Sequence, residues 1–549
     1  MNLSIKLVVA GGALMLGGCA TALQAPQQGS SATISAADLR TRLYAFAADS
    51  MMGRLFGTEG DLKGTQYIAD QLASMGVLPA GENGTYFQTV PAFRVSLAPG
   101  SQAFADGAPL HYRTDFTTTF PASGRALPLD EVEVLYGGDL SDSTSLIPPN
   151  QAAGKAVLFT VGGPLMGNPT RFFSRYPQAA AVLTTSNPAT MRPYMITTLT
   201  DTTPGRLSIV VSPAVGERLM GGPLANARAG QVGRRLRLSS FAFRREPVPA
   251  RNVVGVIPGR DPALRGQYIA IGAHPDHVGM RPGGALDHDS LRAFNTMVQR
   301  IVEARTGETP GSPGSGLTAA ERASIRVNVD SLRRIRPARL DSIYNGADDD
   351  GSGSMAVLEV AEAAAGASTK PRRSLLFVWH TGEEGGLRGS RYFVDNPTVP
   401  RDSIVAQLNM DMVGRGSASD RAGGGEDYLQ LVGSRRLSTE LGDLVESVNS
   451  ASPRPLRFDY SWDASGHPQR IYCRSDHYNY ARHGIPIVFF TTGLHMDYHQ
   501  LTDEPQYIDY ERLRRVSQLV YDVAVRAGNL DHRVVVDKPK PDPMGACVQ

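Results

Sequence analysis

The sequence is short of three features that would each have indicated a particular class of protein. It has only 3 cysteines in 549 residues, so disulfide bonds do not organise the fold. Its charges nearly cancel, with a formal net charge of +2, which argues against a nucleic-acid partner. Its apolar run at the N-terminus, Leu7 to Leu16, is too short to span a membrane. The hydrophobic content of 41% supports large cores, and the length predicts about two domains with insertions.

The same N-terminal run has the character of an export signal, because a lysine precedes it and small residues follow. Leu16-Gly17-Gly18-Cys19 resembles the bacterial lipoprotein cleavage box. The resemblance implies a signal peptide over residues 1–19, a lipid on Cys19 that attaches the chain to a membrane, and a polar tether over 20–31. No Asp follows Cys19, which by the same resemblance implies the outer membrane of the cell envelope, facing the periplasm or the exterior. The alternative is an ordinary signal peptide with a chance cysteine.

The rest of the chain divides by its pattern of strands and helices. Residues 32–92 are predicted to be helical, and residues 93–245 carry short β-like runs separated by Pro and Gly. From 250 to 530 buried strands alternate with helices, which predicts an α/β fold, a three-layer sandwich around a mostly parallel mixed sheet. We therefore interpret 93–245 as an inserted β-rich domain. In sequence character and position it is similar to the protease-associated domain of some exopeptidases.

Two segments stand apart from this pattern. An insertion rich in Arg covers residues 280–343. Its capping box, Thr318-Ala319-Ala320-Glu321, predicts the start of a helix that ends before Pro337. We interpret its basic surface as a solvated face rather than a partner site. The C-terminal residues 531–549 bear Pro and Lys and are predicted to be a loose tail.

Carboxylates and histidines gather where predicted strands end, which is where sites form in such sheets. The five stretches are Gly272 to His277, Asp348-Asp349-Asp350, Glu383-Glu384, Asn409-Met410-Asp411 and Tyr498 to Asp503. Carboxylates this dense beside buried strands are costly unless a cation neutralises them. The set supplies imidazoles and carboxylates without thiolates, which suits zinc, and too many ligands for one tetrahedral site. We predict two zinc ions that share a bridging ligand.

These five motifs, in this order, resemble the zinc-dependent exopeptidases of the bacterial secreted leucyl-type aminopeptidases. The relatives of that family include glutamate carboxypeptidase, the transferrin receptor ectodomain and glutaminyl cyclases. The resemblance covers residues 252–530 well and 32–89 loosely. It implies that His274 and Asp411 bind one zinc, that Glu384 and His499 bind the other, and that Asp349 bridges both.

The resemblance also implies roles around the metals. Glu383 is expected to be the general base, Asp276 to orient His274, and Tyr498 to stabilise the oxyanion. A cis peptide bond is expected after Asp349. We interpret His277 and His380 as structural residues or as supports of the ligands. Ser475-Asp476-His477 resembles a segment of the family that lines the site, and we interpret it as a helix N-terminus with its serine as cap.

The predicted function is an aminopeptidase that removes N-terminal residues from peptides by means of a metal-activated water. A carboxypeptidase or a glutaminyl cyclase of the same fold remains open, as does a non-catalytic binding module, although no expected ligand is missing. Ala273-His274-Pro275-Asp276 also resembles the opening of zinc-dependent sugar de-N-acetylases. Those enzymes show a second Asp where this chain has His277, and they do not account for the Glu pair.

Overall fold

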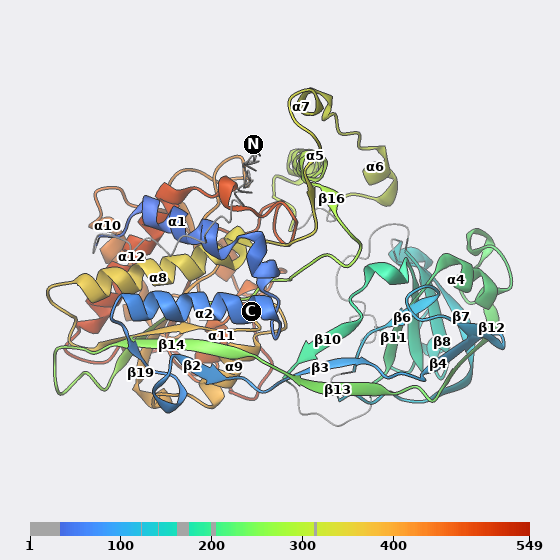
Figure 1. The fold of residues 1–549 in the computed structure, drawn as a ribbon, viewed down its shortest axis with the longest axis horizontal. Coiled ribbons are helices and arrows are strands. Elements are labelled where there is room, and N and C mark those ends of the chain that lie inside the picture. The colour runs from blue at the N-terminus through green and yellow to red at the C-terminus, as the bar shows by residue number, and fades with distance from the viewer. Residues whose placement is uncertain (1–32, 122, 141, 162–174, 199–204, 312–315) are drawn as a thin grey trace, which may run out of the picture.

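A computed structural model describes residues 33–121, 123–140, 142–161, 175–198, 205–311 and 316–549. The expected signal peptide, Cys19 and the tether lie outside these residues. The described chain forms an α/β lobe and a β-rich lobe, with a helical segment standing above their junction (Figure 1). Among the described residues, no helix has the length and apolar character that crossing a membrane requires.

A nine-stranded mixed sheet is the middle layer of the α/β lobe. Its central strands β18, β15, β19 and β22 run parallel, whereas β14 and β20 join them antiparallel on either side. Strands β15, β18 and β19 are almost fully buried apolar runs between polar turns, as expected for parallel strands that are covered on both faces. The strands of this sheet are β1 (Leu78–Pro79), β2 (Phe87–Thr89), β14 (Arg251–Ile257), β15 (Tyr268–Ala273), β18 (Ser374–Trp379), β19 (Ile404–Met410), β20 (Tyr428–Val432), β21 (Arg457–Asp459) and β22 (Ile487–Thr491).

Helices cover both faces of this sheet, so the predicted three-layer sandwich is confirmed. Ile269 and Ile271 of β15 point into the larger core, whereas Ala270 points into the core on the opposite face. The larger core is closed by α1 (Ala36–Phe46), α2 (Glu59–Ser74), α8 (Gly353–Gly366), α10 (Thr439–Ser450) and α12 (Tyr510–Gly528). The opposite core is closed by α9 (Arg388–Asp395) and α11 (His477–Ala481).

The β-rich lobe leaves the α/β lobe after β2 and returns at β14. Its crossing strands β3 (Ala92–Leu97) and β13 (Phe243–Val248) pair antiparallel, and β10 (Tyr194–Thr197) joins β3 in a three-stranded sheet between the lobes (Figure 1). Among its described residues, the lobe is an eight-stranded sheet with helix α4 (Pro213–Met220) packed on it. The strands are β4 (Gln102–Ala105), β5 (Ala108–Leu110), β6 (Phe116–Thr118), β7 (Leu129–Asp139), β8 (Ala156–Thr160), β9 (Ala181–Thr185), β11 (Leu207–Val211) and β12 (Val232–Ser239).

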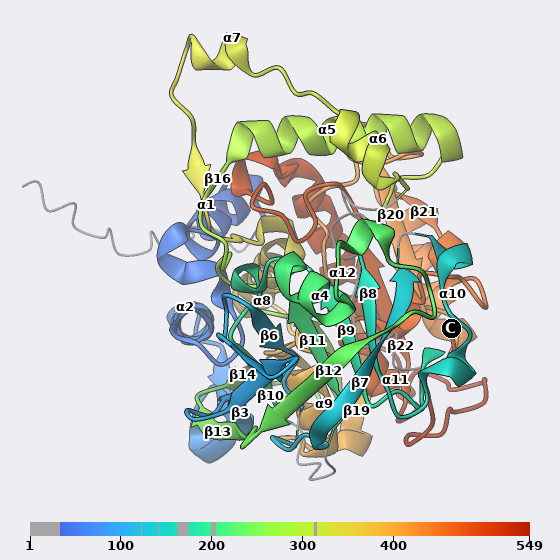
Figure 2. The same ribbon diagram turned by 90° about the vertical axis from the view of Figure 1, so that its right-hand side faces the viewer.

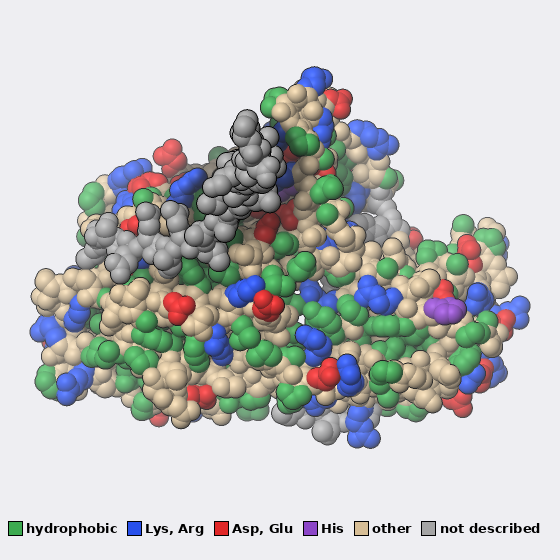
Figure 3. Space-filling model, viewed as in Figure 1, with side chains coloured by type: hydrophobic (Ala, Val, Ile, Leu, Met, Phe, Trp, Pro, Cys, Tyr) green, Lys and Arg blue, Asp and Glu red, His purple; other side chains and the backbone are tan. Residues whose placement is uncertain are grey.

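The insertion between β15 and α8 forms the segment that stands above the junction. Helix α5 (His288–Thr306) lies across the top of the molecule, followed by α6 (Ala319–Ser324) and α7 (Asp330–Arg333), and the segment is tied at its base by β16 (Leu286–Asp287) and β17 (Leu340–Asp341) (Figure 2). Lys and Arg side chains mark its outer surface (Figure 3). The predicted capping box is present, but the prediction of one helix reaching Pro337 is wrong, because α6 ends at Ser324.

The C-terminal segment differs from its prediction. Cys473 and Cys547 form a disulfide bond, which their spacing alone could not reveal. The side chain of Gln549 is buried; its Nε2 donates to the carbonyl of Trp462 at 2.9 Å, and its Oε1 accepts from the backbone N–H of Tyr472 at 3.0 Å. The prediction of a loose tail over 531–549 is therefore wrong for the end of the chain, which is fastened to the α/β lobe.

Candidate metal centre

Four parallel strands deliver the predicted site residues to one edge of the sheet. His274 follows β15, Glu383 and Glu384 follow β18, Asp411 follows β19, and His499 lies in the loop after β22. The acidic turn that precedes α8 packs against the same edge. Because the carboxyl ends of neighbouring parallel strands meet, residues far apart in the chain converge there.

The first cluster consists of His274, Asp349 and Asp411. The Nε2 atom of His274 lies 3.4 Å from Asp349 Oδ1 and 3.7 Å from Asp411 Oδ1. All three side chains are buried, and one ligand atom from each lies within 4.8 Å of the others. This is the group that the sequence resemblance assigned to one metal.

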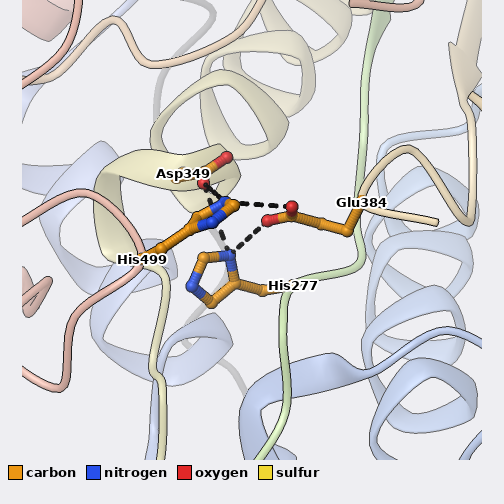
Figure 4. Close-up of side chains that lie close together, drawn as sticks. All are labelled: His277, Asp349, Glu384 and His499. Atoms are coloured by element: carbon orange, nitrogen blue, oxygen red, sulfur yellow. Dashed lines mark ion pairs between the residues drawn. The ribbon is translucent and has the colours of Figure 1, made fainter. Parts of the chain in front are cut away.

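The second cluster contains the expected Asp349, Glu384 and His499, and one histidine that sequence reasoning set aside. The Nε2 atom of His499 lies 3.0 Å from Asp349 Oδ2 and 2.9 Å from Glu384 Oε2. The Nδ1 atom of His277 lies 2.9 Å from Glu384 Oε1 and 3.6 Å from Asp349 Oδ2 (Figure 4). We expected His277 to be structural or to support the ligands, whereas its ring points into the cluster and its Nδ1 is one of the candidate ligand atoms.

Asp349 belongs to both clusters and presents a different oxygen to each. Its Oδ1 faces His274, and its Oδ2 faces His499 and His277. One carboxylate oxygen therefore faces each cluster, which is the arrangement that the bridging role implied by the resemblance requires.

The polar atoms of the two clusters are better explained as metal ligands than as hydrogen-bond partners of one another. Within the part of the chain that the structure describes, several of their buried polar atoms find no hydrogen-bond partner, although they face each other closely. Burying such atoms unpaired would be costly. Imidazole nitrogens and carboxylate oxygens are the donors of mixed N/O metal sites. The atoms are His274 Nε2, His277 Nδ1 and Nε2, Asp349 Oδ2, Glu384 Oε1 and His499 Nε2.

The two aspartates beside Asp349 explain how the turn aims it. Asp350 accepts backbone N–H groups from His274 (3.0 Å), Gly353 (3.0 Å) and Met412 (3.2 Å). Asp348 accepts from the backbone N–H of Gly414 at 2.7 Å. Both flanking carboxylates are therefore occupied by the scaffold, which leaves Asp349 for the clusters. The peptide bond between Asp349 and Asp350 is cis, as predicted.

Asp503 and Gly346 also fix the backbone of the Asp348-Asp349-Asp350 turn. The carboxylate of Asp503 accepts the backbone N–H groups of Asp348 and Asp349 at 3.0–3.1 Å. Gly346 adopts a φ of +56°, and a Cβ there would lie 2.5 Å from the Cγ atom of His277. Only glycine therefore lets the backbone pass behind the histidine ring without displacing it.

Arg54 ties the turn to the loop that carries His274 and His277. Its fully buried guanidinium donates to the carbonyls of Pro275 (2.8 Å), Asn345 (2.6 Å) and Gly346 (2.8 Å), and also to that of Phe46 (3.1 Å). Burial lowers the pKa of Arg54 to about 10, against the pull of the nearby aspartates. Sequence reasoning missed this residue, since a lone arginine in a loop gives no signal of its partners.

Glu383 lies beside the first cluster without joining it. Its Oε2 atom is 3.9 Å from His274 Nε2, and it lines a cavity of about 50 Å³ together with Asp349, Asp411 and Tyr498. Burial raises the pKa of Glu383 well above its ordinary range; His274 opposes this shift and Asp411 adds to it. A carboxyl group in this position, beside the ligand atoms but outside their groups, is placed to accept and release a proton there.

Asp276 lies next to His274, but its backbone carbonyl lies closer to the histidine than the carboxylate that was expected to orient it. The Nδ1 atom of His274 is 3.1 Å from the backbone carbonyl of Asp276 and 3.7 Å from its carboxylate. The carboxylate accepts the backbone N–H groups of Gly382 (2.8 Å) and Glu383 (3.1 Å). Asp276 thus fixes the backbone of the Glu pair as well as lying beside the histidine.

Two other groups border the first cluster. Ser475 Oγ donates to Asp411 Oδ2 at 2.7 Å, and the cap of α11 is Asp476, so the interpretation of Ser475 as a helix cap is wrong. The ring of Tyr498 stacks on that of His499 with centroids 3.9 Å apart. Burial raises the pKa of Tyr498 well above its ordinary range, which keeps its hydroxyl protonated. His380, the other histidine near the ligands in sequence, belongs to neither cluster, and its Nε2 lies 2.8 Å from the hydroxyl of Tyr480.

Fold and site together define an α/β protein with two adjoining metal-ligand clusters at the carboxyl ends of its strands. Comparison with known proteins places this class more closely. The model of peptidase family M28 matches residues 329–524. This match agrees with the resemblance found in the sequence and extends over residues 329–524.

Individual relatives cover parts of the chain. Leupeptin-inactivating enzyme 1 of Streptomyces exfoliatus is 46% identical over 80 residues, which are 14% of this chain and 18% of that protein. Leucine aminopeptidase 1 of Trichophyton rubrum is 25% identical over 207 residues, 36% of this chain and 52% of that protein. The chain thus spans about half or less of the length of these relatives. A solved zinc aminopeptidase from Bacillus subtilis superposes with a TM-score of 0.54 at 16% identity, covering 91% of this chain and 97% of that one, which confirms the fold.

Proposed function

We propose that the α/β lobe is a dizinc aminopeptidase that removes N-terminal residues from peptides. The observation that carries the proposal is Asp349, which turns one carboxylate oxygen to each of two ligand clusters. Zinc suits these clusters because their donors are imidazoles and carboxylates. One ion would be held by His274, Asp349 and Asp411, and the other by Asp349, Glu384, His499 and His277.

When bound, the two ions would polarise the scissile carbonyl and lower the pKa of a water molecule. Glu383 takes the proton of that water and delivers it to the leaving amine, since its carboxylate borders the first cluster without contributing to either group of ligands. Tyr498, which lines the same cavity, donates a hydrogen bond to the developing oxyanion. Asp276 keeps Glu383 in place through its backbone.

The choice of aminopeptidase over carboxypeptidase is supported by the relatives, because the one from Trichophyton rubrum is named leucine aminopeptidase 1. The small cavity beside the first cluster also carries apolar side chains, among them Ile471, Phe489 and Leu494, which suit the side chain of such a first residue. Arg474, which is exposed, also borders this cavity. A carboxypeptidase would need such a cation for the C-terminal carboxylate of its substrate, so the test must separate the two activities.

The test is hydrolysis of one peptide in three forms by the purified full chain. The free peptide and its C-terminal amide should lose their first residue, whereas the N-acetylated peptide should stay intact, as read by mass spectrometry. A chelator should stop the reaction and added zinc should restore it. Shortening of the acetylated peptide from its C-terminus, or cyclisation of an N-terminal glutamine in place of hydrolysis, would replace the proposal with a relative of the same fold. A chain that holds zinc without changing any peptide would be a binding module.

We also propose that the chain is exported and anchored by a lipid on Cys19 to the outer membrane of the cell envelope. This proposal rests on the sequence, and the paired Cys473 and Cys547 support it, because disulfides persist in oxidising compartments. Cys19→Ser should move the protein from the membrane fraction to the soluble fraction of the envelope. Retention of the variant in the membrane fraction would contradict the lipid anchor.

A further inference from the structure

A cavity of about 370 Å³ lies between the two lobes and reaches the metal centre. Glu384, a ligand of the second cluster, lines it together with Leu55 and Val278 of the α/β lobe. Its opposite wall comes from the β-rich lobe, where Phe120, Met195 and Ile196 contribute apolar side chains. The volume is within the range of about 300–1,000 Å³ that is typical of ligand pockets.

The two walls are fixed relative to each other. Arg192 of the β-rich lobe donates through Nη2 to the carbonyl of Val278 at 2.6 Å. Ile196 and Val248 pack against a buried cluster that includes Phe56 and Ala250 of the α/β lobe. The cavity is thus held open by contacts on both of its sides, so a ligand need not assemble it.

The metal centre lies between this cavity and the smaller one. Glu383 lines the smaller cavity and Glu384, the next residue, lines the larger. A peptide whose scissile bond lies at the clusters would therefore place one flanking residue on each side. In the proposed function the first residue of the peptide occupies the smaller cavity, so the larger remains for the residue after the scissile bond.

The lining of the larger cavity indicates what it binds. Apart from Arg192, which is engaged with a carbonyl, and Glu384, its walls are mainly apolar or hydroxyl-bearing. Two of the lining residues are methionines, Met191 and Met195, whose flexible thioethers adapt to ligands of different shape.

We propose that this cavity between the lobes binds an apolar side chain on the second residue of the substrate, the residue that follows the scissile bond. The inference rests on the proposed aminopeptidase function and assigns the β-rich lobe a part in specificity. The residues that carry it are Met195 and its neighbours on β10.

The experiment compares kcat/KM for two peptide panels with the zinc-loaded full chain. One panel varies the second residue among Gly, Leu, Phe and Asp behind a constant Leu, and the other varies the first residue. The wild type should favour Leu or Phe over Gly at the second position by roughly tenfold to a hundredfold. Met195→Glu should reduce that ratio to near one. Met195→Trp fills the cavity, so it should lower kcat/KM most for the peptide with Phe at the second position.

Leu127→Glu is the matched control, because it adds the same charge to an exposed residue of the β-rich lobe outside the cavity. It should keep the wild-type ratio. Circular dichroism checks the fold of each variant, and Met191→Glu replaces Met195→Glu if the latter does not fold. The proposal would be overturned if the wild type cleaved peptides without this preference, or if the Met195 variants kept the wild-type ratio. It would also be overturned if those variants changed the preference for the first residue instead of the second. A wild type that cleaves no peptide would overturn the proposed function and this inference with it.

Discussion

Arg54 contributes no metal ligand, yet replacing it with Met should loosen the whole metal centre. The substitution keeps an apolar side chain of similar length and removes all the hydrogen bonds that Arg54 donates to Phe46, Pro275, Asn345 and Gly346. Hydrogen bonds to a charged group contribute about 1.5–3 kcal/mol each, and burying the guanidinium cancels a large part of that sum. We expect the free energy of unfolding to fall by about 3–5 kcal/mol, as when one partner of a buried charged network is removed.

Urea unfolding of the zinc-free protein measures this change. Arg40→Met, an exposed arginine on the adjacent helix α1, is the control and should stay within about 0.5 kcal/mol of the wild type. Arg54→Lys should recover only part of the loss, because an ammonium cannot reproduce the planar fork. Zinc affinity should fall in parallel, since Arg54 joins the loops of both clusters. An Arg54→Met protein with wild-type stability and wild-type zinc affinity would refute the reasoning.

Three further variants test separate parts of the account. Glu383→Gln should lower kcat by at least about a hundredfold at unchanged zinc content, because it removes a proton acceptor and not a ligand; near-normal activity would show that the base is another residue. His277→Ala should weaken the binding of one zinc by about 10- to 100-fold and remove one histidine from the X-ray absorption spectrum, whereas the same change at the exposed His111 should do neither; equal zinc affinity would exclude His277 as a ligand. His477 is buried, and burial lowers its pKa to about 3. Its unfolded pKa is about 6.5, so its stabilising contribution is complete above pH 6.5 and is lost as the pH falls toward 3, which amounts to about 2 kcal/mol at pH 5. His477→Gln should therefore flatten the decline of stability between pH 7 and pH 5, and identical pH profiles would contradict the assignment.

The strands and their polar ends were predictable because the physics that forms them is local. β15, β18 and β19 are unbroken apolar runs, and each is followed at once by a charged or imidazole side chain. Knowing that parallel strands end at a common edge was then enough to bring His274, Glu384 and Asp411 together.

What escaped prediction depends on contacts between distant parts of the chain. Arg54 reaches carbonyls more than 200 residues away, and Cys473 pairs with Cys547 over a separation of 74. Helix α5 was missed because its packed face includes polar residues such as His288, Asn295 and Gln299, which hide the apolar period. His277 gave no separate signal, since a histidine three places after a ligand has no fixed role until the backbone turns it.

The most direct test of the account is the number and separation of the metal ions. Zinc-loaded protein should contain two zinc ions per chain by elemental analysis, and anomalous diffraction should place them roughly 3.5–4 Å apart on either side of Asp349. Asp349→Ala should lose affinity for both ions, because its carboxylate faces both clusters. A single zinc per chain at saturation, or two ions without Asp349 between them, would show that the site is not a dizinc centre bridged by Asp349.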